Sequence, residues 1–170
     1  PLAGWNLIFK RVFDVLLALV AILLTGPLML VTALAVKLTS KGPILYAQER
    51  MGMDGATFPI LKFRTMRKDA DRLLASVLAS DPALQAEFER DHKLKDDPRI
   101  TPIGRFLRRT NLDELPQFWN VLKGDMSVVG PRPNTWAWGV ELYTTVESKI
   151  LSVRPGITDL ASIVFSDEGE

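Results

Sequence analysis

Two adjacent carboxylates, Asp113 and Glu114, lie in the middle of a stretch that is rich in arginine. Pro116 suits a first helical turn and Gly124 a helix end, so we predict a helix that begins near residues 112–116 and ends at Gly124. Both acids then lie at its N-terminal end, where the helix dipole favours negative charge and helps to keep them ionised. Two acids at a helix start are also a common structural arrangement, and this reading stays open.

The apolar residues of this predicted helix have a spacing that lets them share one core-facing stripe, with Asp113 and Gln117 pointing elsewhere. The stripe consists of Leu112, Leu115, Trp119 and Leu122.

Two arginines precede prolines, Arg132 in the sequence GPRP and Arg154 in the sequence RPG. Proline biases the preceding residue toward extended backbone and stiffens the loop, which holds each guanidinium in place. Guanidinium matches phosphate oxygens and Mg²⁺ bridges carboxylate to phosphate, so arginines facing Asp113 and Glu114 indicate a divalent cation and a phosphorylated substrate. A structural network of salt bridges is the alternative, and spacing alone leaves both open.

Several other kinds of chemistry are excluded by composition. The 170 residues contain no cysteine and one histidine, His92, which lies in a charged stretch and is expected at the surface. A histidine-based catalytic triad or a zinc site cannot be built from these residues. The formal net charge of +1 argues against a general nucleic-acid-binding protein.

An apolar segment near the N-terminus, residues 12–36, contains Asp14 as its only charge. As a straight helix it would be roughly 37 Å long, enough to cross a hydrocarbon core of ~30 Å. Gly26 and Pro27 near its middle favour a kink or a break. Basic residues flank both ends, namely Lys10 and Arg11 before it and Lys37 and Lys41 after it. The segment alone favours a spanning helix, with a re-entrant helix-break-helix as the alternative.

The more polar remainder is predicted to be mainly α-helical with a short β-hairpin. Residues 44–49 and 57–65 alternate like strands around a loop that contains Asp54 and Gly55. The second strand would present Lys62 and Arg64 side by side on one face. Without other evidence, this face is interpreted as an ordinary solvent-exposed strand surface. Helical spacing predicts two further helices, over residues 69–79 and 83–94.

Three separated blocks carry a resemblance to a known family. KFRTM (62–66), DDPRITPIGRFLRRTNLDELPQFWNVLKGDMSVVGPRP (96–133) and RPGIT (154–158) closely resemble the bacterial sugar transferases of the monotopic phosphoglycosyl transferase family. The resemblance runs from Lys10 to about residue 163. It implies transfer of a sugar 1-phosphate from a UDP-sugar to undecaprenyl phosphate, with release of UMP, as the first membrane step of a surface glycan or glycoconjugate pathway.

The resemblance also implies roles for individual residues. Asp113 would be the nucleophile of a two-step, ping-pong reaction through a covalent phosphosugar intermediate. Glu114, together with Asp113, would bind the cofactor Mg²⁺. The residues matched to phosphate binding are Lys62, Arg108, Arg132 and Arg154, with Arg64, Arg109 and Gln117 as weaker candidates.

For the membrane segment, the resemblance replaces the spanning helix by a re-entrant one that breaks at Gly26 and Pro27. Both ends would lie on the cytoplasmic side of the bacterial inner membrane, in contact with lipid. The expected domains are a membrane segment over residues 1–41 and a catalytic domain over residues 42–170.

One departure from the family is Asp159, because the family often has glycine after RPGIT. The residues that follow resemble the small, single-domain members, so an N-acetylated or amino-modified hexosamine is the first expectation for the sugar and galactose or glucose the second. The sequence leaves the oligomeric state open, a homo-oligomer included.

Two other functions are compatible with the residues. A metal-dependent phosphodiesterase or pyrophosphatase would use Asp113 and Glu114 only as metal ligands, with water as the nucleophile. A membrane-anchored, non-catalytic scaffold of glycan assembly would use them only as a helix cap.

Overall fold

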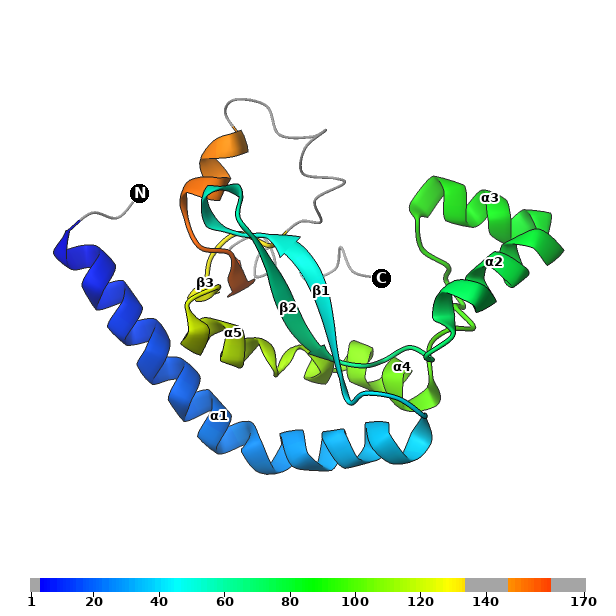
Figure 1. Ribbon diagram of the computed structural model, residues 1–170, viewed down its shortest axis with the longest axis horizontal. Coiled ribbons are helices and arrows are strands. Elements are labelled where there is room, and N and C mark those ends of the chain that lie inside the picture. The colour runs from blue at the N-terminus through cyan, green and yellow to red at the C-terminus, as the bar shows by residue number, and fades with distance from the viewer. Residues whose placement is uncertain (1–3, 134–146, 160–170) are drawn as a thin grey trace. The chain divides into compact units, whose positions relative to one another are not determined.

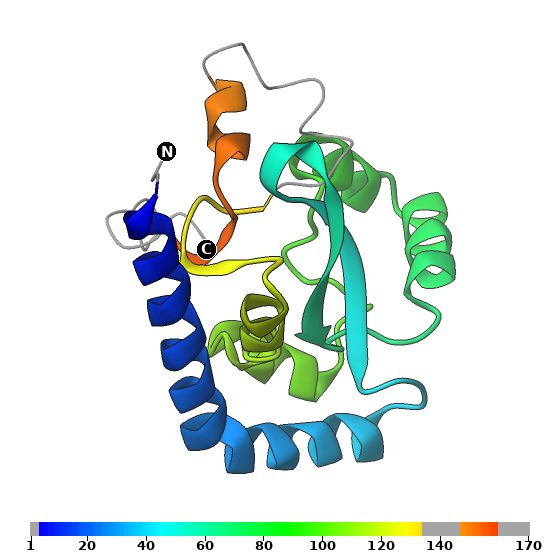
Figure 2. The same ribbon diagram turned by 60° about the vertical axis from the view of Figure 1, so that its left-hand side comes forward.

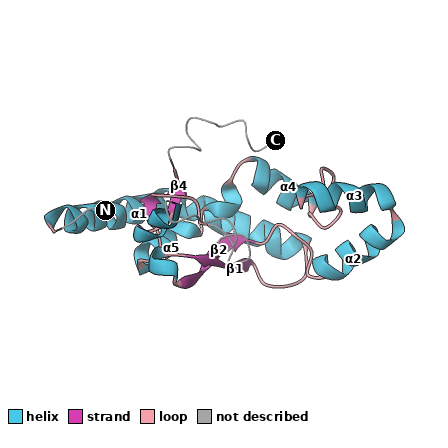
Figure 3. Ribbon diagram, turned by 90° about the horizontal axis from the view of Figure 1, so that it is seen from above, coloured by secondary structure: helices cyan, strands magenta, loops and turns pink. Residues whose placement is uncertain are grey.

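The computed structural model describes residues 4–133 and 147–159. These residues form mainly helices with a short antiparallel hairpin (Figure 3), which confirms the predicted fold class at this level. The elements are α1 (Trp5–Thr39), β1 (Leu45–Met51), the 3-10 turn η1 (Met53–Gly55), β2 (Thr57–Phe63), α2 (Ala70–Ser80), α3 (Pro82–Asp91), α4 (Pro102–Arg109), the 3-10 turn η2 (Leu112–Glu114), α5 (Gln117–Lys123), β3 (Ser127–Val129), the 3-10 helix η3 (Glu147–Ser152) and β4 (Gly156–Thr158).

The chain divides into two compact units. Unit 1 contains Pro1–Met29, Tyr46–Lys62 and Glu114–Glu170, and unit 2 contains Leu30–Leu45 and Phe63–Asp113. The predicted domain boundary between residues 41 and 42 stays a prediction.

Helix α1 is one helical element of 35 residues with Pro27 inside it. By length and composition it is apolar enough to cross a membrane. The assigned helix runs through Gly26 and Pro27 without interruption. Because proline inside a helix removes a backbone donor and clashes with the preceding turn, this pair remains the place where a bend is expected. The re-entrant path stays a prediction.

Unit 1 is built around the β1–β2 hairpin (Figure 1), which confirms the predicted pair of strands. The connecting loop bends through Asp54 and Gly55, whose φ values of 56° and 75° lie in the left-handed region. Strand β2 contributes Phe58 and Ile60 to the buried core. The other fully buried core residues are Ala18 of α1, Val121 of α5 and Met126, which precedes β3.

Strands β3 and β4 form a parallel pair that brings the two proline-containing loops side by side. Ser127 pairs with Gly156, and the Gly156 N–H donates to the Pro131 carbonyl at 2.9 Å. A Cβ at Gly156 would lie 2.1 Å from the Gly130 nitrogen, so only glycine permits this approach. No local pattern in the sequence predicts this pair.

The helix predicted up to Gly124 is shorter than expected. The acids occupy the separate 3-10 turn η2, and α5 begins only at Gln117, after Pro116 at the N-cap position. Asp113 and Glu114 therefore precede the helix and do not lie in its first turn.

The predicted core-facing stripe is confirmed at Leu122, which packs against the buried core, and is wrong at Trp119. Trp119 is 57% exposed, whereas Gln117 and Asn120 are buried. The reason is a backbone requirement of β2: the Asn120 side chain donates to the Pro59 carbonyl at 2.8 Å and accepts from the Leu61 N–H at 3.0 Å. A buried amide that satisfies both backbone groups outweighs the apolar pattern.

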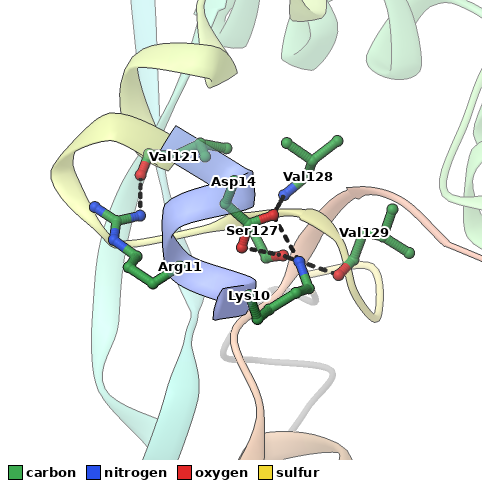
Figure 4. A network of polar contacts seen from close by, with 7 residues as sticks. All are labelled: Lys10, Arg11, Asp14, Val121, Ser127, Val128 and Val129. Atoms are coloured by element: carbon green, nitrogen blue, oxygen red, sulfur yellow. Dashed lines mark hydrogen bonds and ion pairs between the residues drawn. The ribbon is translucent and has the colours of Figure 1, made fainter. Parts of the chain in front are cut away.

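Polar side chains from the first part of α1 attach this helix to α5 and β3, beside which it runs (Figure 2). Asp14, 3% exposed, accepts from the Val128 N–H at 3.1 Å and from Lys10 at 2.6 Å (Figure 4). The Lys10 ammonium also contacts the Ser127 hydroxyl (Figure 4). Arg11 donates to the Val121 carbonyl at 2.6 Å, at the C-terminal end of α5.

Unit 2 contains the two helices predicted over residues 69–79 and 83–94, as α2 and α3. His92 follows α3 with a φ of 51° and is exposed, as predicted. The Thr101 hydroxyl caps α4 by accepting from the Gly104 N–H at 2.9 Å. A Cβ at Gly104 would lie 2.0 Å from the Thr65 carbonyl oxygen, so glycine lets α4 approach the strand end.

Candidate functional site

A polar pocket in unit 1 gathers residues from β1, β2, η2, α5 and the paired loops. It brings together five of the predicted site residues. They are Lys62, Glu114, Gln117, Arg132 and Asp159. Its other lining residues are Arg50, Ile60, Pro133, Gly156, Ile157 and Thr158.

Lys62 and Glu114 form an ion pair in this pocket, with Lys62 Nζ 2.6 Å from Glu114 Oε1. Their side chains are 23% and 28% exposed, so solvent screens the pair only in part. The hydrogen bond from Leu61 to Asn120 fixes β2 one residue before Lys62. Asn120 thereby positions Lys62 although it does not line the pocket itself.

Asp113 and Arg108 belong to unit 2. Asp113 is 7% exposed, and Arg108 Nε donates to the Thr65 hydroxyl at 2.9 Å. Desolvation of its guanidinium lowers the pKa of Arg108, and the carboxylates of Asp113 and Asp97 oppose this shift. The predicted nucleophile therefore has an arginine in its electrostatic environment, and its own peptide bond joins it to Glu114.

The other predicted arginines have different contacts. Arg154 Nε donates to the Gly124 carbonyl at 2.8 Å, at the same end of α5 that Arg11 contacts. In unit 2, Arg64 donates to the carbonyls of Ser40 and Lys41 at 2.9 and 2.6 Å, just beyond the C-terminal end of α1. Arg109 is exposed in the last turn of α4. Phosphate binding by these three stays a prediction.

The pocket has donors that suit Mg²⁺ held jointly with a phosphate. Mg²⁺ is usually bound by one or two carboxylates together with substrate phosphates and water. Glu114 supplies carboxylate oxygens on the pocket wall, and Asp113 directly precedes it in the chain. Within residues 4–133 and 147–159 there is no cluster of three acids or histidines that would hold a metal without substrate.

Sequence reasoning missed Arg50, which lines the pocket from β1. The strand was predicted to end at Glu49, whereas β1 continues to Met51. Burial lowers the pKa of Arg50, and the positive charge of Arg132 lowers it further. The alternating pattern of the first strand could have been followed up to the predicted turn at Asp54 and Gly55. A strand extended in this way would have included Arg50.

Comparison with known proteins gives a family and several relatives. A family model described as "Bacterial sugar transferase" matches residues 5–169. An undecaprenyl-phosphate galactose phosphotransferase of Salmonella typhimurium is 46% identical over 152 residues, which are 89% of this chain and 31% of that protein. Exopolysaccharide production protein ExoY of Sinorhizobium fredii is 44% identical over 163 residues, 96% of this chain and 70% of that protein.

A third relative is a UDP-glucose:undecaprenyl-phosphate glucose-1-phosphate transferase of Escherichia coli. It is 43% identical over 165 residues, which are 96% of this chain and 32% of that protein. The chain thus spans about a third of the length of the Salmonella and Escherichia relatives.

Proposed function

Because this chain belongs to the bacterial sugar transferase family, we propose that it transfers a sugar 1-phosphate from a UDP-sugar to undecaprenyl phosphate and releases UMP. The observation that carries the proposal is the pocket in which Lys62 and Arg132 lie with Glu114, the residue that follows Asp113. Cations of this kind bind phosphate, and the similar proteins are named as undecaprenyl-phosphate sugar transferases.

The proposed reaction has two steps. A carboxylate oxygen of Asp113 attacks the β-phosphorus of the UDP-sugar, and the bond from that phosphorus to the bridging oxygen breaks, so that UMP leaves. An oxygen of undecaprenyl phosphate then attacks the same phosphorus and displaces Asp113, which regains its carboxylate. An aspartate suits this role because it is ionised at neutral pH without a general base.

The pocket side chains neutralise the phosphates during both steps. Lys62 and Arg132 of the pocket bind donor oxygens. Arg108, which does not line the pocket, attracts negative charge at Asp113 within unit 2. Bound Mg²⁺ would be held by Glu114 and Asp113 and would supply charge neutralisation at the leaving UMP.

The membrane segment fits an acceptor that is itself a lipid. Helix α1 is apolar enough to contact lipid. Its first part is hydrogen-bonded to α5 and next to β3, which belong to unit 1, the unit that contains the pocket. We propose that α1 enters the cytoplasmic face of the inner membrane and returns, which would place the catalytic residues at the interface.

The names of the relatives change which sugar donor we expect first. They include galactose and glucose, so we propose UDP-galactose or UDP-glucose as the donor ahead of the hexosamine expected from the sequence. Asp159 lines the pocket, and we propose that it contacts a sugar hydroxyl.

The experiment is transfer by the full chain in membranes, with Mg²⁺, a UDP-sugar and undecaprenyl phosphate. The expected products are UMP and a lipid-linked sugar diphosphate. Sugar phosphate released into water without acceptor would indicate a phosphodiesterase or pyrophosphatase. Absence of UMP with every UDP-sugar would indicate the scaffold.

A further inference from the structure

Arg50 reaches the pocket from β1 and is held there by two contacts. Its guanidinium donates to Gln48 Oε1 at 2.9 Å and to the Pro133 carbonyl at 3.3 Å. The first contact is within its own strand, and the second is to the residue that follows Arg132. Arg50 is half-buried, so the position of its charge is defined by the fold rather than by solvent.

Arg50 and Arg132 line the same pocket with the same charge. Their repulsion contributes to the lowered pKa of Arg50, after burial. Glu114 attracts Arg50 more weakly and is already paired with Lys62. Among the described residues, no carboxylate lies within salt-bridge distance of either guanidinium.

Two like charges in a partly desolvated pocket cost free energy that a bound anion would offset. Phosphate fits this requirement because each guanidinium offers parallel N–H donors to its oxygens. Lys62 is already engaged by Glu114, so the arginine pair is the part of the pocket that an anion would neutralise first.

We propose that Arg50, together with Arg132, forms a phosphate-binding pair in this pocket and that its ligand is the phosphate that leaves as UMP. The identity of the ligand rests on the proposed function. Glu114 directly follows Asp113, the proposed nucleophile, and forms the ion pair with Lys62. The proposed reaction therefore puts Lys62 near the phosphorus that Asp113 attacks. The arginine pair then binds the next phosphate of the donor.

The test is calorimetric titration of the full chain in nanodiscs with UMP and with inorganic pyrophosphate. We expect Arg50→Gln to weaken binding of both at least about tenfold, since a hydrogen-bonded charge pair is lost. Arg50→Lys should restore part of the affinity because it returns the charge. The matched control is Arg72→Gln, whose side chain is 87% exposed on α2, and it should bind both ligands as the wild type does.

The outcomes separate the claims. Unchanged binding of both ligands by Arg50→Gln, with an unchanged melting temperature, would overturn the phosphate site. If UMP binding is unchanged and KM for undecaprenyl phosphate rises instead, the phosphate chemistry stands and the acceptor is its source. If the wild type uses no UDP-sugar but binds pyrophosphate through Arg50, the proposed function fails and the site remains.

Discussion

Ser127 Oγ in β3 lies 2.9 Å from Asp14 Oδ2 in α1, although 113 positions separate the two residues in the chain. Asp14 is the only charge in an otherwise apolar segment, and it is buried against the strand that leads into the GPRP loop. Helix α1 therefore helps to position the strand from which Arg132 follows. An apolar helix that only anchored the protein would not need this carboxylate.

Asp14→Leu should destabilise the protein by about 1–3 kcal/mol, because the Val128 N–H and the Ser127 hydroxyl lose a buried partner and Lys10 loses one of its two contacts. The measurement is the melting temperature in nanodiscs. Thr25→Val is the control, since the Thr25 hydroxyl donates to the carbonyl of Ala21 within its own helix. Equal melting temperatures for the two variants would contradict the attachment.

Asn120→Leu should lower stability by about 1–3 kcal/mol, because the Leu61 N–H and the Pro59 carbonyl lose their partner. It should also raise KM for the donor, since Lys62 follows the strand residue that Asn120 holds. Thermal unfolding and donor titration test both effects. Gln85→Leu, on the exposed face of α3, should change neither. A stable Asn120→Leu protein with normal KM would refute the positioning role.

Acid should weaken the Asp97–Arg99 pair of unit 2, whose atoms are 2.7 Å apart. Burial raises the pKa of Asp97, but the hydrogen bonds from Arg99 outweigh burial and leave this pKa below its usual value. The pair therefore stabilises the fold above the unfolded pKa of about 3.9, and this stability is lost as pH falls through the lower folded pKa.

The comparison is the melting temperature of the wild type and Asp97→Asn from neutral pH downward. The wild type should be more stable at neutral pH, and the difference should shrink below about pH 4. If the difference in melting temperature between the two proteins stays constant over this pH range, protonation of Asp97 does not remove a stabilising ion pair.

Chelation should abolish UMP release, and added Mg²⁺ should restore it. Glu114→Gln keeps the shape of the side chain but removes the charge, so it should require at least about tenfold more Mg²⁺ for half-maximal rate. Asp91→Asn is a suitable control, because Asp91 pairs with the exposed Arg90 at the end of α3, away from the pocket residues in the chain. An unchanged Mg²⁺ requirement in Glu114→Gln would remove Glu114 from the metal site.

Local patterns predicted the local parts of the fold. The β1–β2 hairpin follows from alternation around an Asp-Gly turn, and helices α2 and α3 follow from apolar spacing. The three-residue strands β3 and β4 are too short for any pattern, and their partners are far apart in the chain. Their pairing forms one wall of the pocket, so the arrangement of that wall was not predictable.

The candidate site divides in the same way. Residue types and the family resemblance identified Lys62, Glu114 and Arg132, which the fold brings into one pocket. The stiff loop at Arg154 was expected to hold its guanidinium in place for phosphate. In the structure this guanidinium donates to the Gly124 carbonyl at the end of α5, a partner that only the tertiary structure reveals. Arg50 was missed because the end of this strand was placed at residue 49, two residues too early.

The measurement that tests the central claim most directly is the intact mass of the wild type and of Asp113→Asn after incubation with Mg²⁺ and UDP-galactose or UDP-glucose, without lipid acceptor. We predict that the wild type gains the mass of one phosphosugar while UMP is released, and that Asp113→Asn gains nothing. UMP release that requires undecaprenyl phosphate and leaves no adduct, or an adduct that persists in Asp113→Asn, would contradict the covalent role of Asp113.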